Sequence, residues 1–251
     1  MIRVAPPQRD DLRALFLPDR PGPLVGLHVI QTGLGELLAD RWPEARVAIA
    51  HAGQDRQIAG DPGALGVSDL LALGVERGMF DAPAEFEPLL EAAFPGVWRW
   101  PRVIARLDGA VPRSPLDESV RQLRPDDAPR LAALDAEIDW IWAPWESAER
   151  LAASGMAYGA FEGGRLVSVA TPFHLGAGFE DIGVVTEPGF RRRGLNTACV
   201  ARVVADVRAR GREPSWSTSP DNTASLRLAE KFGARKDRDD VLYMVGPGPS
   251  P

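Results

Sequence analysis

The stretch Ile182-Gly-Val-Val-Thr-Glu-Pro-Gly-Phe-Arg-Arg-Arg-Gly-Leu-Asn-Thr197 decides how this chain is interpreted. Its order predicts an apolar strand, a turn forced by Pro188, and a helix that begins directly after Gly194. The backbone N–H groups of the short basic loop and of the first helical turn can converge on one small space. The helix dipole adds positive charge there, and Gly194 lets the backbone approach a ligand closely. Residues 191–197 are therefore a candidate phosphate site.

Two other interpretations of this loop were weighed. A solvated, arginine-rich turn is the simpler explanation of three arginines in a row. The order strand, proline, basic loop, glycine and helix makes that explanation less favourable. A nucleoside-triphosphate P-loop is excluded, because no lysine follows a glycine in this stretch.

A second motif, Asn222-Thr-Ala-Ser-Leu-Arg-Leu-Ala-Glu-Lys-Phe-Gly233, follows the loop. Asn222 can cap a helix that ends at Gly233. In the loop, Arg191-Arg-Arg-Gly-Leu-Asn196 matches the pattern Gln/Arg-x-x-Gly-x-Gly/Ala except at its last residue. Together with a Pro-x-Phe lead-in that is similar to a Val-x-Pro-x-Tyr segment, these motifs resemble the GNAT superfamily of N-acetyltransferases. The resemblance covers the C-terminal half, about residues 119–246.

The resemblance implies an α/β fold of the α+β type, with a mixed, mostly antiparallel sheet flanked by helices. It implies acetyl-CoA, or another short acyl-CoA, as co-substrate, and direct attack on the thioester by a neutral amine in a ternary complex, with no metal. Backbone N–H groups of the loop would hold the pyrophosphate, and the strand before it would pair with the pantetheine arm. The cofactor-binding residues implied are Val184, Val185, Thr186, Arg191, Arg192, Arg193, Gly194, Leu195, Asn196, Thr197 and Asn222.

A general base is expected, because an attacking amine must lose a proton. Glu180 is the candidate, since it falls near the glutamate of the histone-modifying members, with Asp181 on the opposite face of the strand. A solvated carboxylate at the start of a strand is an equally good interpretation. Many members carry a tyrosine acid where this chain has Ala229, so the acid here is Ser225, a water molecule or absent. Ala229 also motivates the alternative function, a non-catalytic acetyl-CoA-binding or sensing module.

Residues 137–146 combine three tryptophans with three carboxylates. Aromatic faces beside carboxylates suit an ammonium-bearing substrate, and in GNAT-like proteins this region often walls the acceptor site. The expected substrate-binding residues are Trp140, Trp142, Trp145 and Glu146. Packing of the tryptophans between helix and sheet is the alternative.

Composition restricts the function further. The chain has 251 residues, 45% of them hydrophobic and 25% charged, which is typical of a globular protein and long for one domain. A net charge of −6 argues against nucleic-acid binding. The single cysteine, Cys199, excludes an internal disulfide and is interpreted as packing, and the three histidines have no metal-ligand spacing. We expect a cytoplasmic protein without a membrane segment, a small-molecule amine or a peptide N-terminus as acceptor, and no metal; a homodimer is left open.

The proline-containing segment 109–116 predicts a linker between a smaller N-terminal α/β domain, residues 1–113, and the GNAT-like domain, residues 117–251. The N-terminal domain is either a degenerate relative of the same fold or a separate cap. Thr32-Gly-Leu-Gly35 is at most half of a dinucleotide fingerprint, so a nucleotide-binding N-terminal domain is a weak third reading. The elements predicted there are strands at 24–30, 46–50 and 98–107 and helices at 35–42, 68–73 and 83–94.

Overall fold

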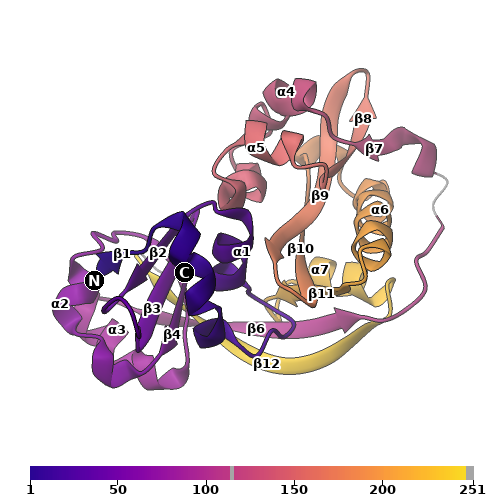
Figure 1. Cartoon of the computed structure of the whole chain (residues 1–251). Helices are drawn as coiled ribbons and strands as arrows, with labels where there is room; N and C mark the ends of the chain where they lie inside the picture. Colours follow the sequence, from indigo (N-terminus) through magenta and orange to yellow (C-terminus); the bar gives the residue numbers. More distant parts are fainter. Residues whose placement is uncertain (114–115, 247–251) are drawn as a thin grey trace.

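The computed structural model describes residues 1–113 and 116–246 (Figure 1). Residues 114–115 of the expected linker and the proline-rich end, residues 247–251, lie outside the described residues. The described strands form one 12-stranded sheet in the order β1-β2-β3-β4-β5-β12-β6-β11-β10-β9-β8-β7. The strands are β1 (Ile2–Arg3), β2 (Glu36–Ala39), β3 (Val47–Ala52), β4 (Asp55–Gly60), β5 (Gly78–Asp81), β6 (Trp98–Leu107), β7 (Val120–Gln122), β8 (Tyr158–Glu162), β9 (Arg165–Leu175), β10 (Phe179–Thr186), β11 (Glu213–Thr218) and β12 (Ala234–Val245). The α-helices are α1 (Val25–Thr32), α2 (Val67–Leu71), α3 (Glu87–Ala93), α4 (Ala128–Ala132), α5 (Ala148–Ala153), α6 (Leu195–Ala209) and α7 (Thr223–Glu230). No helix in these ranges is long and apolar enough to cross a membrane.

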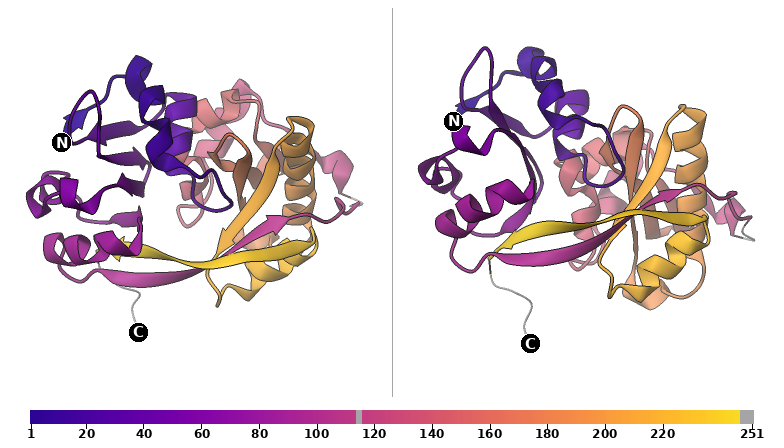
Figure 2. Two further views of the ribbon diagram at one scale, coloured as in Figure 1. Left: turned by 60° about the horizontal axis from the view of Figure 1, so that its bottom comes forward. Right: turned by 90° about the horizontal axis from the view of Figure 1, so that it is seen from below.

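The two halves of the chain repeat one order of elements. The series strand, helix, three strands, helix, strand, helix, strand describes β1 to β6 and, with one extra helix, β7 to β12. Each half has a single parallel pair, β4 with β5 and β10 with β11. The long final strands are exchanged, because β12 lies between β5 and β6 while β6 lies between β12 and β11. Figure 2 shows these two strands running from one half to the other.

The sheet is mixed and mostly antiparallel, as predicted for the GNAT-like half. The division into residues 1–113 and 117–251 stays a prediction, since β6 pairs with β11 and β12 of the C-terminal half and β12 pairs with β5 and β6 of the N-terminal half.

Two predictions in the N-terminal half are wrong. Residues 24–30 form helix α1 instead of a strand, and residues 35–42 contain strand β2 instead of a helix. Residues 25–29 of helix α1 are all buried, so its apolar run has no amphipathic period that separates helix from strand. Gly35 directly precedes β2 and has a φ of 70°, and a Cβ there would stand 2.2 Å from the carbonyl oxygen of His51. The glycines of Thr32-Gly-Leu-Gly35 therefore join a helix to a strand, the reverse of a dinucleotide-binding turn.

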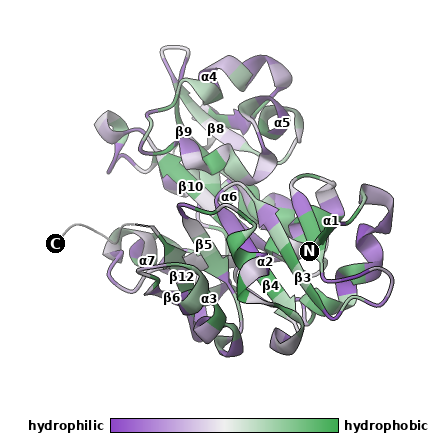
Figure 3. Cartoon of the chain, turned by 90° about the vertical axis from the view of Figure 1, so that its left-hand side faces the viewer, coloured by the Kyte–Doolittle hydropathy of each residue, from purple (hydrophilic) through white to green (hydrophobic). Residues whose placement is uncertain are grey.

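The other elements predicted in the N-terminal half are confirmed, since residues 46–50, 68–73 and 83–94 contain β3, α2 and α3. Strand β6 has the predicted bounds 98–107, and helix α6 begins directly after Gly194 as predicted. Helix α6 packs its apolar face on β8, β9 and β10, and hydrophobic residues gather along the covered strands (Figure 3). Cys199 lies in this core, where burial raises the pKa of its thiol to about 12, so it is a packing residue as expected.

Candidate functional site

The loop between β10 and α6 has the geometry of an anion site. Gly194 stands at the N-cap of α6 with φ of 82°, and Arg192 also has a positive φ of 62°. Within the described part of the chain, the backbone N–H groups of residues 192–196 donate to no other atom. Helix α6 is 15 residues long, so its N-terminus adds a full helix dipole to these donors.

The three arginines lie around the loop with their side chains about half exposed or more. The Arg191 guanidinium donates to the carbonyl oxygen of Thr186 at 3.2 Å, and Arg193 pairs with Glu162 at 2.6 Å. At Gly194 an added Cβ would find its nearest neighbour at 3.6 Å, which is ordinary contact. Gly194 is therefore required by its positive φ and not by a steric clash at its Cβ position.

Strands β10 and β11 form a fork that opens towards this loop. They pair in parallel at Phe179, Glu180 and Asp181 and then separate, although β10 continues to Thr186. The main-chain edge of residues 182–186 that faces β11 is thus left without a strand partner, while the other edge pairs with β9. Val184, Val185 and Thr186, which the sequence assigned to the pantetheine arm, line this edge. An extended ligand can add to it as a strand would.

A buried polar cluster lies at the closed end of the fork. Asp181 is 6% exposed and accepts a hydrogen bond from the Ser215 hydroxyl at 3.1 Å, across the last paired position of β10 and β11. His174 of β9 stands opposite Asp181 and is 3% exposed. Asp55 of β4 reaches the cluster from the N-terminal half, with its Oδ2 3.4 Å from His174 Nε2. Both halves of the chain therefore contribute to this cluster.

The cluster holds groups that can exchange a proton. Burial raises the pKa of Asp181, and the neighbouring His174, Ser215 and Arg102 counteract this only in part. Both ring nitrogens of His174 are buried without a hydrogen-bond partner among the described residues. Nearby His28 differs, because burial lowers its pKa to about 3 and its ring bonds the main chain of Pro144 and Leu175. His28 is therefore neutral, and its two hydrogen bonds link the N-terminal half to the C-terminal half.

Glu180, the residue predicted as base, lies on the other face of β10. It is fully buried, and its two carboxylate oxygens pair with Arg210 at 2.5 Å and Arg212 at 2.9 Å. This arrangement occupies the carboxylate and gives Glu180 a structural ion-pair role. The prediction of Glu180 as general base is therefore not supported, because sequence spacing alone did not show which face of the strand it takes.

Asn222 and Ser225 both have structural partners. Asn222 caps α7 as expected, accepting from the Ser225 N–H at 3.0 Å. The Ser225 hydroxyl accepts from the Trp216 indole at 3.0 Å. Trp216 belongs to β11, so Ser225 adjoins the fork from the side of β11. Ala229 is buried and offers no acid.

The tryptophan segment divides into packing residues and one exposed residue. Trp145 is buried and donates to the Pro172 carbonyl, while Glu146 accepts from the Gly35 N–H at 2.7 Å, so both are used within the fold. Trp142 is half-buried against the α4–α5 core. Trp140 is 42% exposed and stacks edge to face on Phe173, with ring centroids 5.4 Å apart.

Phe173 extends this aromatic contact inwards, because its ring lies 4.7 Å from the His174 ring. An aromatic path therefore leads from exposed Trp140 to the cluster. The cluster itself was missed by sequence reasoning, except that Asp181 was noted beside Glu180. His174 and Asp55 are far apart in sequence and share no motif, so only the fold brings them together.

Comparison with known proteins agrees with this architecture. The family described as GNAT acetyltransferase matches residues 24–243, so the match extends beyond the C-terminal half to which the motif resemblance was confined. A Streptomyces virginiae protein, described as an uncharacterized N-acetyltransferase in the mutA 5′ region, is 38% identical over 215 residues, covering 84% of this chain and 90% of its own. A GCN5-related N-acetyltransferase-like protein from Streptococcus suis has the same fold, with a TM-score of 0.71, 20% identity and coverage of 96% and 99%. A tandem GNAT protein from the clavulanic acid biosynthesis pathway also shares the fold, with a TM-score of 0.57, 11% identity and coverage of 100% and 99%. The chain belongs to the GNAT acetyltransferase family.

Proposed function

We propose that this acyl-CoA-dependent N-acyltransferase moves an acetyl group from acetyl-CoA to the primary amine of a small cationic molecule. The observation that carries the proposal is the fork between β10 and β11, with free N–H groups at its open end and ionisable side chains at its closed end. A ligand with its diphosphate at residues 192–197 and its arm along residues 182–186 would place the thioester close to Asp181. The alternatives within this reaction are a peptide N-terminus as the acceptor and another short acyl group as the group transferred.

The acceptor amine would attack the thioester directly in the ternary complex. We propose Asp181 as the group that takes its proton, with His174 beside it and Asp55 opposite. A carboxylate with a raised pKa is a better base than an exposed one. Backbone N–H groups on the free edge of β10 would polarise the thioester carbonyl. The leaving thiolate needs little help, because a thiol has a pKa near ~8.5, which fits the lack of a tyrosine at Ala229.

The N-terminal half is proposed to be a degenerate copy of the same fold that supplies Asp55 and holds the acceptor wall. The turn between β3 and β4 lies against the tryptophan segment, since a Cβ on Gly53 would be 2.8 Å from the Cβ of Ala143. A cytoplasmic location and a homodimer remain proposals. A sensing module would bind acetyl-CoA and release no CoA with any amine, so turnover with an amine panel separates the two functions.

Gly194→Glu should abolish acetyl-CoA binding. The substitution combines a strained φ with a negative charge among the phosphate-binding donors. In a thermal-shift titration, acetyl-CoA at ~100 times its Kd should stabilise the wild type by about 2.7 kcal/mol, a rise of roughly 5–10 °C. Gly74→Glu is the matched control, because Gly74 has a φ of 62° in open space outside the loop. A shift retained by Gly194→Glu, or lost equally by Gly74→Glu, would remove the basis of the proposal.

Trp140→Ala should raise KM for a cationic amine about 5- to 30-fold, the equivalent of a ~1–2 kcal/mol cation–π contact. The value of kcat should change little, since Trp140 contacts His174 only through Phe173. Initial rates with an amine found in the panel provide the measurement. Leu71→Ala is the control, because Leu71, on α2, is also an exposed apolar residue. An unchanged KM in Trp140→Ala would place the acceptor elsewhere.

A further inference from the structure

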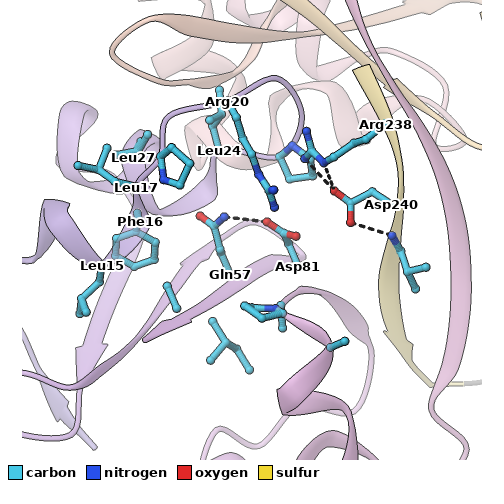
Figure 4. Close-up of a pocket in the computed structure, with 18 of the residues that line it drawn as sticks. Leu15, Phe16, Leu17, Arg20, Leu24, Leu27, Gln57, Asp81, Arg238 and Asp240 are labelled. Atoms are coloured by element: carbon cyan, nitrogen blue, oxygen red, sulfur yellow. Dashed lines mark hydrogen bonds and ion pairs between the residues drawn. The ribbon is translucent and has the colours of Figure 1, made fainter. Parts of the chain in front are cut away.

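A cavity of about 620 Å³ lies in the N-terminal half, away from the CoA loop (Figure 4). Its walls come from the segment 15–27, from β4, from residues 81–84 at the end of β5 and just after it, and from β12. Phe16, Leu24 and Leu27 form an apolar wall, and Gln57 and Asp81 lie across from it. This volume is in the range of small-molecule binding sites.

The cavity lies at the fork of β4 and β5, which corresponds to the fork of β10 and β11. In both halves three residue pairs run in parallel before the strands separate. The third pair is Gln57 with Asp81 in one half and Asp181 with Ser215 in the other. In both, a side-chain hydrogen bond to the aspartate closes the fork, at 2.7 Å from Gln57 Nε2 to Asp81 Oδ2 and at 3.1 Å in the other half. The N-terminal half thus has a matching fork, but its aspartate lies on the second strand of the pair, β5, whereas Asp181 lies on the first strand, β10.

The loop that follows β4 has no phosphate site. Residues 61–66 read Asp-Pro-Gly-Ala-Leu-Gly and contain no basic side chain. The Gly63 N–H is taken by the Asp61 carboxylate at 2.8 Å, and the Gly66 N–H by that of Asp69 at 3.0 Å. Two carboxylates stand where a diphosphate would need free donors, so the occupant of this fork is not a CoA ester.

Among the charged side chains that line the cavity, Arg20 and Asp81 have no ionic partner among the described residues. Asp240 is paired with Arg238 at 2.8 Å, and Asp239 with Lys236 at 2.6 Å. Arg20 makes no ion pair with any described residue, and Asp81 has only the Gln57 amide. Figure 4 shows the Arg20 side chain extending towards Gln57 and Asp81. Gln57 itself is held by the Gly26 N–H at 2.8 Å, so it keeps Asp81 in place.

We propose that this cavity binds a zwitterionic amino acid with an apolar side chain. Its ammonium group would bond the free oxygen of Asp81, its carboxylate would pair with Arg20, and its side chain would pack on Phe16, Leu24 and Leu27. Burial, aided by the Asp240 charge, raises the pKa of Asp81 to about 6, against which Gln57, Arg20 and Arg238 act. Asp81 is therefore ionised at pH 8, where the ammonium group is still largely charged.

The test is calorimetric titration of the full chain at pH 8 without acetyl-CoA, using leucine, phenylalanine and tryptophan. At least one should bind saturably. For phenylalanine as the probe, phenethylamine lacks the carboxylate and 3-phenylpropanoate lacks the ammonium group, and each should bind more weakly than phenylalanine. Asp81→Asn keeps an acceptor for Gln57, so it should fold, and it should weaken binding roughly tenfold or more, as should Arg20→Gln.

Asp239→Asn is the matched control, because it removes a charge from the same lining without touching either proposed partner, and it should bind like the wild type. Gly194→Glu should also bind like the wild type, which separates this site from acyl-CoA binding. The proposal is overturned if none of the three amino acids binds saturably. It is equally overturned if the binding survives both Asp81→Asn and Arg20→Gln unchanged.

Discussion

Asp181→Asn is expected to lower kcat by ~10²-fold or more, the usual contribution of a general base. Asparagine has the same shape and can still accept from Ser215 at the closed end of the fork, but it cannot take a proton. Binding of acetyl-CoA should be little changed, because the N–H donors proposed to bind its diphosphate lie at the other end of β10. Steady-state kinetics with acetyl-CoA and an amine found by screening provide the measurement.

The dependence of kcat on pH gives a second test of Asp181 as the general base. Burial raises the pKa of Asp181, so its carboxylate is fully available above that pKa and is lost as the pH falls through it. The wild type should therefore lose kcat on the acid side at a pH above ~4, the ordinary value for aspartate. His174, Asp55, Arg102 and Ser215 face Asp181 and will shape that limb. If Asp181→Asn keeps both its rate and its acid limb, the base is another group.

Glu180→Ala is expected to destabilise the fold by about 3 kcal/mol, the lower end of the effect of breaking a buried ion pair. Glu180 is fully buried, whereas its partners Arg210 and Arg212 are 27% and 23% exposed and can recover part of their hydration. For a chain of this size, the midpoint of thermal unfolding should fall by roughly 6–12 °C. Below that midpoint, kcat should stay within about threefold of the wild type, because a group that is not the general base does not contribute the ~10²-fold of one.

Glu213→Ala serves as the control for this substitution. Glu213 pairs with Arg106 at 3.1 Å but is 57% exposed, so its loss should change stability by no more than about 0.5 kcal/mol. Comparable destabilisation by both variants would mean that Glu180 is no more than a surface ion pair. A Glu180→Ala protein that folds normally and has lost its turnover would restore Glu180 as the base.

The C-terminal half was predictable because its local signals agree with its packing. Pro188 and Gly194 mark the turn and the helix start, and Asn222 caps the next helix. In the N-terminal half these signals fail at α1, β2 and β4. Helix α1 is apolar on nearly every side, and strand β4 reads Asp-Arg-Gln-Ile-Ala-Gly, with no hydrophobic run to reveal it. Exchange of β6 and β12 between the halves has no local signature at all.

The candidate site was only half predictable for a similar reason. The loop is a contiguous motif, and its donors follow from the backbone. The buried polar cluster depends on which face of β10 the side chain of each carboxylate takes, and on Asp55 reaching it from β4. Glu180 and Asp181 are adjacent, so an inference by spacing could select either one. Burial and charge partners distinguish them, and both are properties of the folded chain.

Hydrogen exchange measured by mass spectrometry, with and without acetyl-CoA, tests the central claim most directly. The two forks are internal controls for each other, because each has a parallel strand pair whose two strands are connected by a helix. Acetyl-CoA should slow exchange at residues 182–198, where a ligand would cover the free edge of β10 and the start of α6. Residues 58–71, the corresponding stretch after the fork of β4 and β5, should exchange at an unchanged rate. Protection at residues 58–71, with none at residues 182–198, would contradict the account.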